Sequence, residues 1–295
     1  MPLPVLPVLD ALAPVVVGIA AGWLWARSGR GLDSAGLTQL LTTVGTPCLI
    51  FAGLARARLA PEALATMALA AVVALGLIAL LAVVALQFLR LPVRTFFASI
   101  AFPNAGNLGL PIALLALGEE GFAYAIVFFA FSSIGNFLVG QAVAAGGLGL
   151  GALLRMPLVW AACGGILVSL LGITLPRPIS GSLELLGAMT IPLMLLLLGS
   201  SLAQLRLASG GRATAVAALR FCIGLSVGLA VAWGAGLEGT ARATLILQCA
   251  MPISLYSYLF AQRFGNAPEE VAGAVLVSTL LAAVTVPLVL VVLTG

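Results

Sequence analysis

The chain has no histidine and no lysine, and only 7% of its 295 residues are charged. Without histidine, a Ser-His-Asp triad, a His-x-x-Glu-His zinc site and a histidine proton relay are all excluded. The absence of lysine also removes the amine nucleophile. The four cysteines occupy separate apolar runs without metal-ligand spacing: Cys48, Cys163, Cys222 and Cys249. We therefore expect no metal, no cofactor and no enzyme activity.

Charge is scarce because apolar residues dominate. A soluble domain carries roughly a quarter charged residues, whereas this chain is 62% hydrophobic. Only a lipid bilayer can solvate so much apolar surface, so the composition predicts an all-α polytopic membrane protein. A transmembrane helix needs about 20 apolar residues. Ten such runs are present, at 6–26, 34–54, 62–88, 94–117, 121–145, 155–175, 181–205, 213–235, 241–263 and 270–293.

The arginines predict the orientation of these spans, because cytoplasmic loops carry the excess of positive charge. With the N-terminus outside, eight arginines lie on the cytoplasmic side: Arg27, Arg30, Arg90, Arg94, Arg155, Arg206, Arg212 and Arg263. Four lie outside: Arg56, Arg58, Arg177 and Arg242. We expect a plasma (inner) membrane protein with both termini on the non-cytoplasmic side. No basic patch with interleaved aromatic residues indicates a nucleic-acid partner.

The two halves of the chain resemble each other in the placement of their breaks. Pro47 corresponds to Pro192, Pro103 to Pro252 and Gly118 to Pro268, with offsets of 145, 149 and 150 residues. Each half, 1–146 and 147–295, holds five spans, so the second enters the membrane from the opposite side. This pattern predicts two inverted five-helix repeats. Chance matching among sixteen prolines is the alternative.

Two stretches place helix-breaking residues inside apolar spans, at 102–111 in the fourth and 249–254 in the ninth. Pro103 and Pro252 lack the N–H that an α-helix needs, so both helices must open there. In a bilayer, open backbone is tolerated only inside protein or beside a water-filled cavity. Paired breaks of this kind are typical of a transporter's substrate site, where the broken helices cross. Proline kinks that only shape packing are the alternative.

After each break, the resuming half-helix presents free amide groups and a partial positive charge. Such a terminus binds a carboxylate without any basic side chain. The nine acidic residues lie in loops or near span ends, so no buried carboxylate repels an anion or suits a proton/cation exchanger. The polar candidates for substrate contact are Asn104, Asn107, Gln248 and Ser254, with Asn136 of the fifth span.

Four further residues have two interpretations each. Thr46, Pro47 and Pro192 line the site or only bend their helices. Arg220 lies within the eighth span. It either snorkels or pairs with backbone carbonyls, or it attracts anions in the inner vestibule.

At these residues the chain resembles the auxin efflux carrier family. The matching pieces are Pro47, Phe102-Pro103-Asn104 with Gly109-Leu110-Pro111, Thr190-Ile191-Pro192 with Gly199-Ser200, and Met251-Pro252 with Phe260-Ala261. The resemblance implies a compact prokaryotic member whose ten helices form two inverted repeats, as in the fold shared with bile-acid/sodium symporters. It also implies scaffold and transport bundles, a substrate site where the broken helices cross, and a carboxylate held by Asn104.

We therefore expect a secondary transporter or facilitator of small organic anions, auxin-like or malonate-like, that uses elevator-type alternating access. The symporters of this fold have acidic residues near the ninth-span break, where this chain has Gln248. A sodium- or proton-coupled symporter of the same fold is the alternative. Faces rich in small residues would permit a homodimer in the bilayer.

Overall fold

The computed structural model describes residues 5–29, 32–56, 60–146, 157–205 and 210–294. These residues form helices and no strand; one isolated antiparallel bridge joins Pro103 and Ile253. The predicted boundary between the halves, after residue 146, adjoins 147–156, which lies outside the described residues. Arg30, Arg58, Arg155 and Arg206, which entered the orientation count, lie outside them too.

The helices are α1 (Val5–Arg27), α2 (Ser34–Leu40), η1 (Leu41–Gly45), α3 (Thr46–Arg56), α4 (Pro61–Phe88), α5 (Val93–Ala101), η2 (Ala105–Gly109), α6 (Leu110–Gly135), η3 (Asn136–Gly140) and α7 (Gln141–Ala145). They continue with α8 (Pro157–Leu170), α9 (Arg177–Ala188), α10 (Thr190–Gln204), α11 (Gly210–Gly234), α12 (Gly239–Cys249), α13 (Leu255–Phe264) and α14 (Pro268–Thr294). The three η segments are single π-helical turns. Such turns are rare and frequent at functional sites.

Among the described residues, seven helical stretches are long and apolar enough to cross a bilayer. They are Val8–Arg27, Ser34–Arg56, Pro61–Phe88, Ala105–Ala145, Arg177–Gln204, Gly211–Gly234 and Pro268–Leu293. Large apolar side chains also cover the outside, and Trp233 is 83% exposed. An apolar exterior of this extent belongs in lipid. The chain is an all-helical, multi-pass membrane protein.

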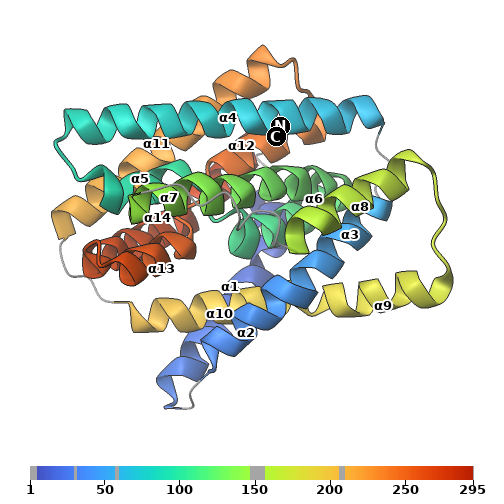
Figure 1. Ribbon diagram of the computed structural model, residues 1–295, viewed down its shortest axis with the longest axis horizontal. Helices are drawn as coiled ribbons and strands as arrows, with labels where there is room; N and C mark the ends of the chain where they lie inside the picture. The colour runs from blue at the N-terminus through green and yellow to red at the C-terminus, as the bar shows by residue number, and fades with distance from the viewer. Residues whose placement is uncertain (1–4, 30–31, 57–59, 147–156, 206–209, 295) are drawn as a thin grey trace.

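The helices pack in two groups (Figure 1). The first bundle contains α1, α2, η1, α3, α8, α9 and α10, and its largest contacts are α1 on α10 and α3 on α8. The second bundle contains α4, α5, η2, α6, η3, α7 and α11 to α14, with α11 packed on α14 and α12 on α6. Figure 1 shows α4 and α11 on one side of the molecule and α1, α2, α9 and α10 on the other.

Glycines hold the first bundle together by letting two backbones approach closely. A Cβ on Gly22 would meet the Leu196 carbonyl, and one on Gly199 would meet the Ile19 carbonyl. Small residues that admit a neighbouring backbone are a common means of packing helices in membranes. The small-residue faces of α1 and α10 therefore serve packing within the chain.

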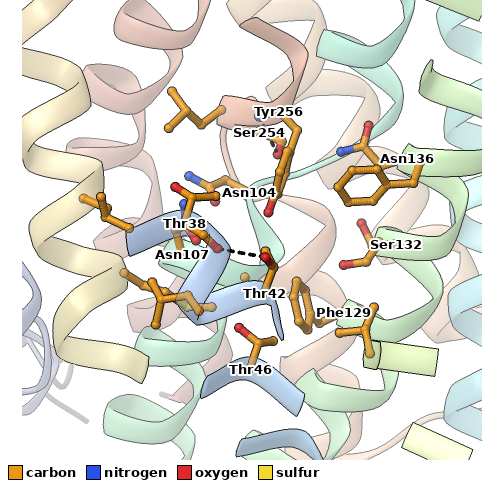
Figure 2. A pocket seen from close by; sticks show the side chains of 18 of the residues that line it. Thr38, Thr42, Thr46, Asn104, Asn107, Phe129, Ser132, Asn136, Ser254 and Tyr256 are labelled. Carbon is orange, nitrogen blue, oxygen red and sulfur yellow. Dashed lines mark hydrogen bonds between the residues drawn. The ribbon is translucent and has the colours of Figure 1, made fainter. Parts of the chain in front are cut away.

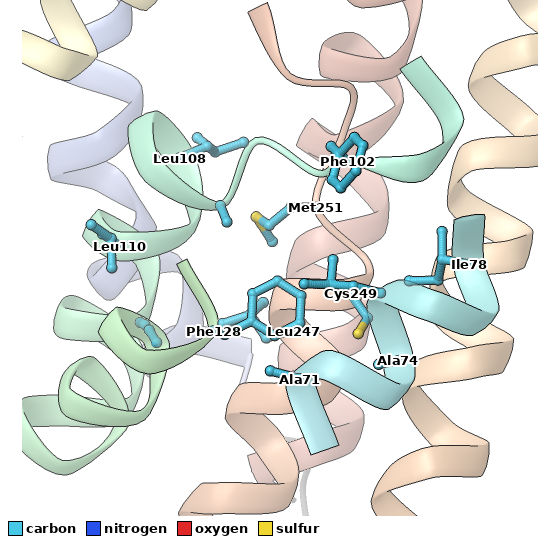
Figure 3. Packing of buried hydrophobic residues seen from close by; sticks show 14 of the residues in the cluster. Ala71, Ala74, Ile78, Phe102, Leu108, Leu110, Phe128, Leu247, Cys249 and Met251 are labelled. Carbon is cyan, nitrogen blue, oxygen red and sulfur yellow. The ribbon is translucent and has the colours of Figure 1, made fainter. Parts of the chain in front are cut away.

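The core of the second bundle surrounds the two broken helices. Figure 3 shows Ala71, Ala74 and Ile78 of α4 packed beside the Cys249 end of α12. Phe128 of α6 covers the same region from the other side. All of these side chains are fully buried. Apolar packing on both sides therefore encloses the breaks in protein, as open backbone in a bilayer requires.

Candidate functional site

The two breaks meet in direct contact (Figure 3). Helix α5 ends at Ala101 and the chain continues extended at Phe102, with φ −118° and ψ 119°. Helix α12 ends at Cys249. The extended segments run antiparallel, and the Asn104 amide donates a hydrogen bond to the Pro252 carbonyl at 2.8 Å. We call this region, residues 102–104 and 250–254, the crossover.

Proline explains why the chain opens here, and neighbouring groups explain how it stays open. Pro103 and Pro252 carry no N–H, so neither can extend the helix before it. The Ile253 amide, which would continue α12, donates instead to Ser278 Oγ of α14 at 3.1 Å. The Ser278 hydroxyl in turn donates to the Val275 carbonyl at 2.9 Å. Polar groups of the second bundle thus satisfy the freed backbone.

Two helix N-termini begin at the crossover. The π-helical turn η2 starts after Asn104, whose side chain makes no capping hydrogen bond. Helix α13 starts after Ser254, whose Oγ accepts a hydrogen bond from the Tyr256 amide at 3.4 Å. Free amides and helix dipoles give such termini partial positive charge and an affinity for anions.

A pocket with a volume of about 420 Å³ opens between the two bundles beside these termini. From the first bundle it is lined by Thr38, Leu41, Thr42, Thr43, Thr46, Pro157, Leu158, Met194, Leu197 and Ser201. From the second it is lined by Pro103, Asn104, Gly106, Asn107, Phe129, Ser132, Ser133, Asn136, Phe137, Ser254, Leu255, Tyr256 and Leu259. Figure 2 shows the labelled side chains of both bundles around one shared space. A pocket of this kind, mostly apolar with a few convergent polar groups, is typical of a small-molecule site.

Two buried residues of the pocket lining have a hydrogen-bonding atom without a partner among the described residues. Asn104 is 3% exposed and its Nδ2 has no partner among the described residues. Asn136 is 4% exposed and its Oδ1 likewise has none. An unsatisfied buried polar atom costs about 1–3 kcal/mol. These two lining residues therefore keep one donor and one acceptor unpaired, at an energetic cost that a ligand hydrogen-bonded to them would offset.

Arg220 of α11 is fully buried and donates to three backbone carbonyls. Its Nη1 bonds to the Ile100 carbonyl at 2.6 Å and its Nε to the Met251 carbonyl at 3.2 Å. Its Nη2 bonds to the Cys249 carbonyl. Of the two interpretations drawn from the sequence, pairing with backbone carbonyls is the one that the structure shows. Arg220 does not line the pocket.

The sequence profile of the membrane transport protein family matches residues 7–140 and 149–290. The chain belongs to this family, the auxin efflux carriers. Members of the family are transporters and not enzymes. An uncharacterized transporter of Methanothermobacter thermautotrophicus is 27% identical over 269 residues, 87% of this chain and 88% of the relative. A Rhizobium meliloti protein named "Putative malonate transporter" is 26% identical over 200 residues, 63% of this chain and 62% of the relative.

In this member of the family, several residues singled out from the sequence line one pocket. They are Asn104, Asn107, Asn136 and Ser254, with Thr46 and Pro103. The others lie elsewhere: Pro47, Pro192, Gln248 and Pro252 are not among the lining residues. Gln248 is fully buried on α12, and the nearest atoms to a Cβ placed on Gly109 of η2 would belong to its side chain. Neither Gln248 Oε1 nor Nε2 has a partner among the described residues.

Two walls of the pocket were not predicted from the sequence. One is formed by Thr38 and Thr42, whose i, i+4 spacing with each other and with Thr46 was the available signal. The other is aromatic. Phe137 and Tyr256 contribute to it with ring centroids 4.9 Å apart, and Phe129 lies against Gly106. Nothing in the sequence alone distinguishes these aromatic residues from the rest of the apolar interior.

Proposed function

We propose that this transporter moves small organic anions that carry a single carboxylate, with the carboxylate bound at the crossover. The observation that carries the proposal is the unpaired Nδ2 of Asn104, a residue that lines the pocket beside two helix N-termini. The carboxylate would accept hydrogen bonds from Asn104 and from the free amides of η2, with Asn107 and Ser254 as further contacts. A charge-assisted hydrogen bond contributes about 1.5–3 kcal/mol.

The pocket walls favour a monocarboxylate with an apolar body over a malonate-like dicarboxylate. Phe129, Phe137 and Tyr256 offer aromatic surface, and leucine and methionine line much of the remainder. No arginine is among the described lining residues, so a second carboxylate would lack a cationic partner. The name of the Rhizobium relative keeps malonate-like acids as the second candidate class.

For the membrane arrangement, we propose ten spans in two inverted repeats, 1–146 and 147–295. Three features of the structure support a count of ten spans. The stretch Ala105–Ala145 contains a non-helical Gly118, with φ 69° and ψ −167°, so it accounts for the end of one span and the whole of the next. Helices α12 and α13 are halves of one broken span. Helix α8 is a further, shorter apolar helix. We place the chain in the inner membrane with both termini outside.

The mechanism we propose is elevator-type alternating access, in which the second bundle carries the crossover past the first. The pocket lies between the bundles, as this motion requires. Several polar contacts between residues far apart in the sequence join helices of the same bundle. Arg212 pairs with Glu270 at 3.2 Å and Thr240 donates to Glu120 at 3.0 Å in the second bundle. Arg56 pairs with Glu184 at 3.3 Å in the first.

Efflux of labelled organic acids from reconstituted vesicles tests the proposal. We expect saturable transport of aromatic monocarboxylates, and a loss of affinity of about tenfold, or 1.4 kcal/mol, in Asn104→Ala. The matched control is Asn266→Ala. It removes the same amide from a residue that instead bonds the Ala144 carbonyl at 2.8 Å, and it should transport as the parent does. Unchanged affinity in Asn104→Ala would show that the carboxylate binds elsewhere.

A further inference from the structure

The carbonyls that Arg220 binds are those that the two breaks release. In an α-helix the Ile100 carbonyl would accept from the Asn104 amide, but that amide donates to Pro252. The Cys249 carbonyl would accept from the Ile253 amide, but that amide donates to Ser278. Both carbonyls therefore lose their helical partners at the crossover, and one guanidinium takes the place of both.

These two carbonyls occupy corresponding positions in the two halves of the chain. Ile100 and Cys249 are 149 residues apart, the same offset that relates Pro103 to Pro252. At this offset Arg220 corresponds to Ala71 of α4, which is fully buried and packs beside the Cys249 end of α12 (Figure 3). A single cation, supplied by one half only, thus serves both broken helices.

The charges balance. Each helix C-terminus carries roughly half a negative charge, so the ends of α5 and α12 together present about one. The single positive charge of Arg220 lies against both ends. The N-termini of η2 and α13, with the opposite polarity, border the substrate pocket. Arg220 therefore contacts the negative side of the crossover, and the proposed anion site lies on its positive side.

The α11 backbone is shaped to admit this guanidinium. Gly224 lies one turn after Arg220, and a Cβ on it would meet the Cys249 carbonyl and Arg220 Nη2. Only glycine leaves both groups where they are. A small cavity of about 10 Å³ beside Arg220, Pro252 and Ser278 has no room for a further solvated ion.

We propose that Arg220 is the resident cation of the crossover. Clustered backbone carbonyls are also the ligands with which proteins hold alkali cations. Here the side chain supplies that charge permanently, so the carrier requires no bound sodium ion and its flux is independent of sodium. Arg220 acts as a positioning residue: it fixes the two helix ends whose partner termini bind the substrate. The claim about flux rests on the proposed function, whereas the claim about the cation site does not.

Thermal unfolding of purified Arg220→Ala in detergent tests the site without any transport measurement. Guanidinium at millimolar concentration should raise its melting temperature by about 2–4 °C relative to choline at equal ionic strength. The parent protein should show no rise. Arg212→Ala is the matched control, because it removes an exposed arginine from the same helix and should also show none. Equal melting temperatures for Arg220→Ala in guanidinium and choline would overturn the proposal.

The parent protein provides the second arm, which holds even where Arg220→Ala does not fold. Its flux in vesicles should be the same in sodium and in choline, and a several-fold fall in choline would overturn the proposal. In Arg220→Ala, flux should fall and then recover with guanidinium, which a purely structural defect would not show. Failure of the proposed carboxylate site gives a different result. Asn104→Ala would then transport as the parent does, while guanidinium would still raise the melting temperature of Arg220→Ala.

Discussion

The main-chain amide of Asn104 donates a hydrogen bond to the carbonyl of Pro252, at 2.8 Å and across 148 residues of sequence. Asn104 directly follows Pro103, which opens the first broken helix, and Pro252 opens the second. The same pair of segments forms the isolated bridge between Pro103 and Ile253. The candidate anion site is therefore made jointly by both halves of the chain, and a change in either half should alter it.

Replacing Asn104 with aspartate tests the sign of the charge on the cargo. Asn104→Asp keeps the shape of the side chain, but it replaces a donor with a negative charge. If the cargo is an anion, we expect Asn104→Asp to bind it more weakly than Asn104→Ala does, because repulsion adds to the lost hydrogen bond. Ligand-induced thermal shifts of the two variants measure this order, and tighter binding by Asn104→Asp would indicate a cationic cargo.

Substrate affinity should not depend on pH between 5 and 8, apart from ionisation of the substrate itself. The described residues that line the pocket include no aspartate, glutamate or arginine. Their one phenol, Tyr256, stays neutral over this range. Isothermal titration calorimetry at several pH values measures the affinity, with a strong acid as the ligand because it stays fully ionised throughout. A tenfold change in affinity would require a titrating group that this pocket does not contain.

Phe129 should set the preference for apolar substrates. It lines the pocket from α6 and lies against Gly106 of η2. Removing a buried aromatic surface from a ligand contact should cost an aromatic monocarboxylate about 1.4 kcal/mol, or roughly tenfold in affinity. A malonate-like acid should lose little. Competition assays with both classes of acid on Phe129→Ala give the two values, and equal losses would show that Phe129 only supports the local packing.

Gly224→Ala should destabilise the protein by about 1–3 kcal/mol, because the added methyl group displaces Arg220 or the Cys249 carbonyl. Gly211→Ala on the same helix is the control. A Cβ there meets no atom within 4 Å, so its stability should stay equal or rise slightly. Thermal unfolding compares the two, and a Gly224→Ala protein as stable as the control would mean that α11 tolerates a side chain at the crossover.

Gln248→Met should stabilise the protein by about 1–2 kcal/mol, since it removes a buried amide whose two polar atoms have no partner among the described residues. Substrate affinity should be unchanged because Gln248 does not line the pocket. Thermal unfolding and ligand titration on the same sample measure both. Weaker substrate binding would instead support the contact that the sequence suggested for Gln248.

The breaks at Pro103 and Pro252 could be predicted because proline acts locally, through its missing N–H and its ring. The side of α12 on which Gln248 lies could not be predicted from the sequence. Residues 243–249 of that helix are all buried, so no polar face marks which way a side chain points. Thr38 and Thr42 were missed for a related reason. Their helix turns through the π-helical segment η1, which shifts the register of the face that reaches the pocket.

Arg220 illustrates a further limit. A lone arginine in an apolar span fits several environments, and its acceptors here are main-chain carbonyls, which every residue possesses. Only the contact between α11 and both broken helices identifies which carbonyls are free.

The bond between Asn104 and Pro252 and the shared guanidinium fix the two broken helices to each other. If the second bundle moves as one body, the groups around the carboxylate keep their geometry at every position that it takes. The affinity for the substrate would then be similar from either face of the membrane. A carrier built in this way has no intrinsic direction: concentration gradients and membrane potential alone would decide whether it imports or exports its cargo.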